Sequence, residues 1–211
     1  RREIHITIPK PAQVKSGVGT ISIRDHGAGL DETGLANALR AGYAGKNRYD
    51  ALGLFGMGFN IAAGKLGRRT VISTSCRGTS EELRVVYDLT DIIKQQTFNA
   101  PITRIAKSEP QHSGTTVEVM DWWPEGHQNA NLARDLARIT GKKLREQLGR
   151  RYASLLRDDS SRGIRMYLNG DPIAPFHHCV WDDSRYVERK RARIPAVFRF
   201  DEEVARTRRC I

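Results

Sequence analysis

Two glycine-rich stretches of this sequence carry residues whose types and spacing could do chemistry. The first is Asp25-His26-Gly27-Ala28-Gly29, and the second, residues 52–60, contains Gly53, Gly56 and Gly58. Glycines leave backbone amides open to an approaching anion, and a helix that follows them adds its positive end. The carboxylate of Asp25 suits an exocyclic amino group beside a ring nitrogen, as in adenine. Together the two stretches predict a nucleotide site.

Other interpretations of the glycines remain open at this point. No Lys-Ser or Lys-Thr follows residues 53–58, so they do not form a Walker loop, and the polar segment 41–52 before them is not the strand of a Rossmann fingerprint. Small residues would equally allow close packing of a helix on a sheet. In a nucleotide site, Gly27 and Gly29 would form a tight turn that leaves room for a flat ring. Taken alone, however, Asp-x-Gly-x-Gly is a common turn.

Three further residues could complete such a site. Lys46 and Arg48 precede the second stretch and could reach phosphates if the segment 41–52 closes as a loop, although a solvated loop charge explains Arg48 at least as well. Thr115 begins a predicted strand, where a hydroxyl could bridge through water to Asp25 and a base. Taken alone, a threonine there reflects strand propensity.

The elements that must position these groups follow from hydrophobic periodicity and turn residues. Alternating or apolar runs predict strands at 3–8, 20–24, 70–75, 83–87, 115–120 and 164–168, the last continuing through an Asn169-Gly170 turn into 172–176. Helices are expected after an Asp31 N-cap, at 57–66 before Gly67, and at 132–139 and 144–155. Segments 9–19 and 41–52 are expected to be loops. The fold class is α+β, a mixed, mostly antiparallel sheet with helices on one face.

The joint pattern resembles the GHKL ATPase superfamily, whose members include DNA gyrase, the large heat-shock chaperones, histidine kinases and MutL. The resemblance rests on the order and spacing of Asp25-x-Gly27-x-Gly29, Gly53-x-Phe55-Gly56-x-Gly58-Phe59 and Gly114-Thr115-Thr116. It covers roughly residues 1–176 and implies the two-layer Bergerat fold. The MORC-like and chaperone-like branch looks most similar, because of Gly53 to Phe59, Gly149-Arg150-Arg151-Tyr152 and Leu168-Asn169-Gly170.

The resemblance implies a role for each matching residue. Asp25 would bind the adenine amino group, Gly29 and Leu30 would line the base pocket, and Thr115 would support the adenine contact through water. Residues 41–52, with Lys46, would be the ATP lid. The phosphates would be held by Gly53, Leu54, Phe55, Gly56, Met57, Gly58 and Phe59. The implied ligands are ATP or ADP with Mg²⁺, and the implied assembly is an ATP-dependent homodimer.

One departure from the family limits what this chain is expected to do. The family carries Glu-x-x-x-Asn on a helix before the first strand, where the glutamate activates water and the asparagine binds Mg²⁺. This sequence begins at or after that point, and Glu125 with Asn129 is out of order beside Pro124 and Gly126. We therefore expect neither a catalytic residue nor a metal ligand here, and the family's phosphate-sensing lysine would lie beyond Ile211.

Two functions are compatible with these residues. The first is the ATP-binding domain of a dimerising clamp or chaperone-like ATPase, with DNA association, and the second is a non-hydrolysing nucleotide-binding or scaffold module. A histidine kinase catalytic domain fits less well, because no dimerising histidine helix precedes this segment and Gly114-Thr115 extends the pattern. The net charge of +11 permits attraction to nucleic acid, although a solvated basic surface is an equal interpretation.

Composition sets the remaining expectations. The 211 residues suit one domain at 1–176 and the start of a transducer-like second domain or an extension at 177–211. Three cysteines without a Cys-x-x-Cys pair favour a reducing, cytoplasmic setting. His177-His178-Cys179 lacks a second ligand pair and is expected to be structural. No apolar run is long enough for a membrane span.

Overall fold

A computed structural model describes residues 2–40, 58–98, 100–107, 109–139, 141–156, 163–176, 186–190 and 192–195. The strands are β1 (Arg2–Thr7), β2 (Ile21–Asp25), β3 (Arg69–Ser75), β4 (Glu81–Asp88), β5 (Ile102–Ala106), β6 (Gly114–Met120), β7 (Ile164–Leu168), β8 (Asp171–Pro172), β9 (Tyr186–Arg189) and β10 (Ala192–Pro195). The helices are α1 (Pro11–Lys15), α2 (Glu32–Leu39), α3 (Gly58–Leu66), α4 (Leu89–Gln95), α5 (Ala130–Arg138), α6 (Gly141–Arg151) and α7 (Ala153–Leu156).

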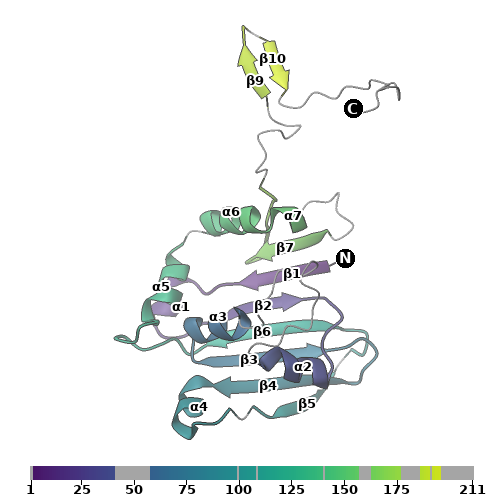
Figure 1. Ribbon diagram of the computed structural model, residues 1–211, viewed down its shortest axis with the longest axis vertical. Coiled ribbons are helices and arrows are strands. Elements are labelled where there is room, and N and C mark those ends of the chain that lie inside the picture. The colour runs from purple at the N-terminus through teal and green to yellow at the C-terminus, as the bar shows by residue number, and fades with distance from the viewer. Residues whose placement is uncertain are drawn as a thin grey trace, which may run out of the picture.

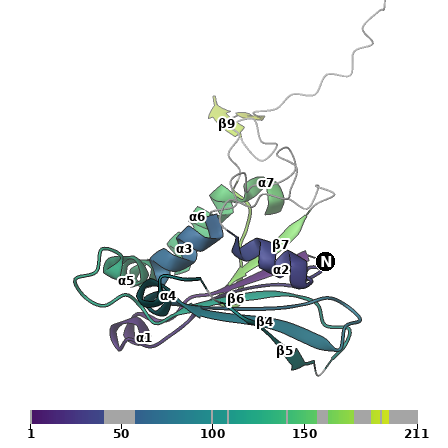
Figure 2. The same ribbon diagram turned by 60° about the horizontal axis from the view of Figure 1, so that its bottom comes forward.

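One large sheet forms a layer of its own, and α2, α3, α6 and α7 lie over one of its faces (Figures 1 and 2). Its eight strands run in the order β5-β4-β3-β6-β2-β1-β7-β8. Every pairing is antiparallel except that of β1 with β7. The predicted α+β class, with a mostly antiparallel sheet and helices on one face, is therefore confirmed. Strands β9 and β10 pair in a separate sheet.

Alternation along β1 decides which side chains face the helices. Ile4 and Ile6 pack against a buried cluster of Leu156, Met166, Leu168 and Ile173, to which α6 adds Leu144 and Leu148. Because successive side chains of a strand point to opposite faces, Glu3 and His5 point away from the helices. We call the two sides the helix face and the open face.

A second buried cluster joins α2 to the sheet centre through Leu35, Ile72, Val85 and Tyr87. Asp31 begins this helix as predicted, accepting a hydrogen bond from the Gly34 amide at 2.7 Å. We expect Leu35→Ala to lower the free energy of unfolding by about 2–5 kcal/mol, because Leu35 is fully buried and truncation leaves a cavity. Urea denaturation measures this loss. Leu132→Ala on α5, where the leucine is 42% exposed, is the control, and equal losses in the two variants would contradict this packing.

Tyr87 gives the fold a dependence on alkaline pH. Burial raises the pKa of its phenol above the ordinary 10.0, so the folded chain disfavours ionisation more than the unfolded chain does. The resulting stability is complete below pH 10.0 and is lost as the pH rises towards the raised pKa. Urea denaturation above and below that pH should show a steeper alkaline loss for the wild type than for Tyr87→Phe. Identical pH profiles would refute this role for Tyr87.

Several elements differ from those predicted. Segment 9–19 contains the short helix α1, with Pro11 in its first turn. The predicted helix 144–155 is divided at Tyr152 into α6 and α7, and strand 172–176 is reduced to the two-residue β8. Helix α4 and strand β5 were not predicted. Asp88 caps α4 by accepting from the Thr90 amide at 2.7 Å, and β5 is an edge strand with mostly exposed side chains, so its alternation is weak.

The structure leaves two predictions from the sequence untested. The loop 41–52 and the His177-His178-Cys179 run lie outside the described residues. The division of the chain at residue 176 stays a prediction. Within the described part of the chain, none of the helices combines the length and apolar character that crossing a membrane requires.

Candidate functional site

Asp25 ends β2 with its side chain on the helix face. The strand register places it opposite Ile4 of β1 and Thr115 of β6, and Ile4 packs under α6 and α7. The half-buried carboxylate accepts a hydrogen bond through Oδ1 from the Gly27 amide at 2.7 Å. This local turn fixes the orientation of the carboxylate before any ligand arrives.

A pair of threonine hydroxyls lies beside Asp25 on the same face. Thr74 of β3 is buried, and its Oγ1 lies 3.0 Å from Oγ1 of Thr115. The Thr74 hydroxyl also accepts a hydrogen bond from the Leu30 amide at 2.8 Å and donates one to the Gly114 carbonyl at 3.2 Å. Since a hydroxyl has one hydrogen, these bonds together require Thr115 to be the donor of the pair. Thr74 therefore ties the turn after β2 to the start of β6.

Two glycines permit the close contacts around this turn. Gly29 has φ +75°, and a Cβ there would lie 1.9 Å from the Ser75 carbonyl oxygen at the end of β3. Gly114 has φ +137°, and a Cβ there would lie 2.1 Å from the Asp25 carbonyl oxygen. Ser113 adds a hydrogen bond from its hydroxyl to the Gly27 carbonyl at 2.9 Å. The turn is thus held against β3 and β6 by backbone contacts that a side chain would block.

The second glycine stretch is described only at its end. Gly58, which begins α3, has open space where a Cβ would stand, and Phe59 packs against the same buried cluster as Leu30. The structure thereby brings the end of the second stretch to the apolar group that also contacts the first. Lys46, Gly53, Leu54, Phe55, Gly56 and Met57 lie outside the described residues, so their roles stay predictions.

Sequence reasoning missed Thr74, which sits at the centre of this hydrogen-bond network. A usable signal was present, because Thr74 occupies the same face of β3 as the buried Ile72, two residues earlier. A polar side chain at a buried strand position needs a hydrogen-bond partner. Nothing in the sequence alone shows that the partners of Thr74 would be Leu30, Gly114 and Thr115.

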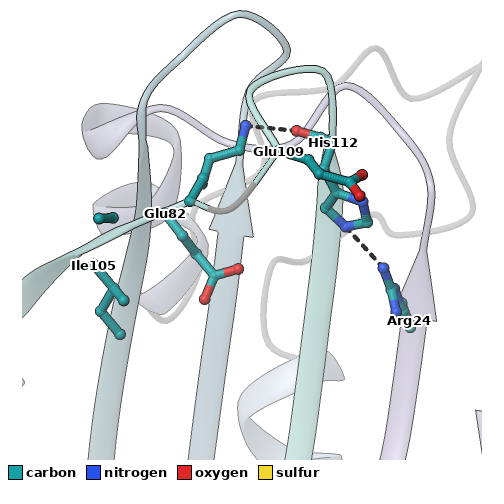
Figure 3. Close-up of a pocket in the computed structure, with 7 residues that line it drawn as sticks. Arg24, Glu82, Ile105, Glu109 and His112 are labelled. Atoms are coloured by element: carbon teal, nitrogen blue, oxygen red, sulfur yellow. Dashed lines mark hydrogen bonds between the residues drawn. The ribbon is translucent and has the colours of Figure 1, made fainter.

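Two other groups of polar side chains lie on the open face. Among the described residues, Glu3, His5 and His26 are the one set of three potential metal ligands whose ligand atoms lie close together. A cavity of about 360 Å³ is lined by Arg24, Glu82, Ile105, Ala106, Lys107, Glu109 and His112 (Figure 3). The Lys107 ammonium donates hydrogen bonds to the carbonyls of Cys76, Pro110 and His112, so it stabilises the loop around the cavity. Both groups therefore lie on the other side of the sheet from the Asp25 side chain.

The sequence and the fold were compared with known proteins. A family model described as histidine kinase-, DNA gyrase B- and HSP90-like ATPase matches residues 2–118, more than half of the chain and including both Asp25 and Thr115. The comparison with curated proteins found no significant match.

Solved structures support the same fold. The ATPase region of Saccharomyces cerevisiae topoisomerase II matches with a TM-score of 0.51 and 14% identity, covering 81% of this chain and 42% of that one. The same region bound to ICRF-187 (dexrazoxane) matches with the same values. At this identity the likeness concerns the fold alone, and the chain spans less than half the length of these structures. On the family match, the chain belongs to the histidine kinase-, DNA gyrase B- and HSP90-like ATPases of the GHKL superfamily.

Proposed function

We propose that this domain binds ATP and ADP on the helix face of the sheet, with the adenine ring against Asp25. The observation that carries the proposal is the fixed Asp25 carboxylate beside the linked hydroxyls of Thr74 and Thr115. The exocyclic amino group of adenine would donate to the carboxylate. Thr115 would reach the ring through a water, and Gly29 and Leu30 would border the base.

The phosphates would extend from the adenine towards the start of α3. Open space at Gly58 and the positive end of this helix suit a negatively charged group. Gly53, Leu54, Phe55, Gly56, Met57 and Phe59 would supply further backbone donors and packing, as the resemblance implies. Residues 41–52 would close over the nucleotide as a lid, bringing Lys46 to the phosphates.

Hydrolysis is proposed for the full-length protein, in which water would attack the γ-phosphate. Mg²⁺ would neutralise charge on the phosphates when bound. Among the described residues, the one cluster of three potential metal ligands lies on the open face, on the other side of the sheet from Asp25. We therefore assign to this chain the binding and orientation of the nucleotide. In the full-length protein, Mg²⁺ would be bound by the asparagine that the family resemblance implies.

ATP turnover separates this proposal from a non-hydrolysing binding module. The full-length protein should release phosphate from ATP, whereas the 211-residue chain should bind ATP without turnover. Binding without turnover in both would favour the binding module. Absence of binding in both would contradict the proposed site itself.

Membership of the MORC-like or chaperone-like branch, and an ATP-dependent homodimer acting as a clamp, are proposed from the same resemblance. DNA association is supported by the net charge of +11, part of which lies on α6. Two cations of this helix are engaged within the fold: Arg145 pairs with Asp171, and the Arg150 guanidinium lies 3.9 Å from the centre of the Phe176 ring. Because fewer cations of α6 are then available to phosphates, binding to duplex DNA should be weak and should fall as the salt concentration rises.

Comparing ADP with IDP tests the adenine assignment. IDP carries a carbonyl where adenine has its amino group, so it would place an acceptor against the Asp25 carboxylate. We expect calorimetry to show ADP binding at least about tenfold more tightly than IDP, a difference of about 1.4 kcal/mol. Equal affinities would exclude the proposed contact.

A further inference from the structure

We propose that Glu3, His5 and His26 form a site for a divalent transition-metal ion, of which Zn²⁺ is the best fit. Glu3 and His5 are two residues apart on β1, so both project onto the open face. His26 follows β2, and its amide donates to the Glu3 carbonyl at 3.2 Å, which continues the ladder one residue beyond the Ile4 and Asp25 pair. His26 therefore lies opposite Glu3 at the same corner of the sheet.

The distances suit a metal centre after a small closure. The three ligand atoms lie within 4.8 Å of one another, and His5 Nε2 is 3.5 Å from Glu3 Oε2. Tetrahedral zinc, with bonds of about 2.0–2.2 Å, places its ligand atoms about 3.3–3.6 Å apart. Glu3 and His5 already have this spacing. The side chain of His26 is exposed, so its rotation can bring the third ligand in.

The types of ligand select the class of metal. Two imidazoles and a carboxylate suit Zn²⁺ and its neighbours among the transition metals, whereas Mg²⁺ and Ca²⁺ prefer oxygen ligands. Three protein ligands also leave one tetrahedral position for water. This site on the open face is thus distinct from the Mg²⁺ site that would accompany ATP on the helix face.

Neighbouring rings hold His5 in place. Its ring stacks on Tyr167 of β7, with centroids 4.7 Å apart and planes inclined by 8°. Its edge contact with the His26 ring has centroids 5.2 Å apart and planes at 82°. Rings fixed by packing lose little freedom when they bind a metal. Of the three ligands, His5 is therefore the best ordered in advance.

Two arginines on the open face set a limit on the affinity. Arg165 lies opposite Glu3, and Arg24 lies opposite His5. The Arg24 guanidinium turns to His112, where its Nη2 is 2.8 Å from Nε2 (Figure 3). A guanidinium only donates, so this ring nitrogen of His112 accepts and is not a metal ligand in this arrangement. With Arg165 beside Glu3, we expect Kd for Zn²⁺ in the micromolar range.

Titration of Zn²⁺ into the 211-residue chain tests the site. To remove the His177-His178-Cys179 run as a competing set of ligands, the background carries His177→Ala, His178→Ala and Cys179→Ala. Calorimetry should show one Zn²⁺ per chain, and thermal unfolding should shift upwards when Zn²⁺ is present. Mg²⁺ at the same concentration should produce neither effect.

Single variants identify the ligands. His26→Ala, at an exposed position that should not disturb folding, should weaken Zn²⁺ binding at least about tenfold, since loss of even an outer-shell partner costs about 10–100-fold. His127→Ala is the matched control, because His127 stacks on Trp123 at 3.9 Å, and it should leave Zn²⁺ affinity unchanged. The proposal is overturned if the background chain binds no Zn²⁺, or if His26→Ala binds it as tightly as His127→Ala does.

Discussion

Asp25→Asn is expected to weaken ADP binding by at least about tenfold while leaving the fold intact. A hydrogen bond to a charged group is worth about 1.5–3 kcal/mol, or roughly 10–150-fold in affinity. We expect a loss of affinity because of the turn after β2, in which the Gly27 amide donates a hydrogen bond to one side-chain oxygen of residue 25. In the variant, the asparagine oxygen would keep this bond, which turns its NH₂ group towards the amino group of adenine. Two donors would then face each other.

The matched control for this experiment is Asp31→Asn. Asp31 is also an aspartate on a turn that accepts a backbone hydrogen bond, but it caps α2 at an exposed position. Asparagine caps helices as well as aspartate does, so the control should fold and bind ADP like the wild type. Calorimetric titration of the three proteins with ADP gives the comparison. If Asp25→Asn and Asp31→Asn bind ADP equally well, adenine does not contact Asp25.

Gly29→Ala is expected to lower the free energy of unfolding by about 2–5 kcal/mol, the sum of backbone strain and overpacking. The positive φ of residue 29 strains any side chain, and the added Cβ would lie 1.9 Å from the Ser75 carbonyl oxygen. Either the turn after β2 or the end of β3 must therefore move. The movement would also displace the Leu30 amide from Thr74, so ADP binding should be lost in the folded fraction.

Gly17→Ala separates the two contributions. Gly17 has the same φ, +75°, but no atom lies within 4 Å of its added Cβ. This variant therefore carries the strain without the clash and should lose only about 1 kcal/mol. Urea denaturation of both variants gives the difference. Equal losses at the two positions would mean that the turn around Gly29 has more room than its contact with β3 implies.

Much of the sheet could be predicted because its strands alternate clearly. Ile4 and Ile6 on β1, and Val117 and Val119 on β6, each mark the buried face of a strand. Asp31 at the start of α2 and the Asn169-Gly170 turn carry local signals that do not depend on tertiary contacts. For the same reason Asp25 could be placed at the end of a strand, beside glycines.

The remainder depends on contacts between distant residues. Thr74 acquires its role only when β3 pairs with β6 and the turn after β2 folds back onto it. Strand β5 contributes Ile102 to the core, but its other side chains are mostly exposed, so no local alternation marks it as a strand. The meeting of His26 with Glu3 and His5 likewise needs the pairing of β1 and β2.

A crystal structure of the chain with ADP tests the central claim most directly. We predict the adenine amino group within about 3 Å of an Asp25 carboxylate oxygen, on the helix face and with Thr115 nearby. The diphosphate should point towards the start of α3. Adenine bound on the open face, for example in the cavity lined by Arg24, Glu82 and His112, would contradict the proposed site.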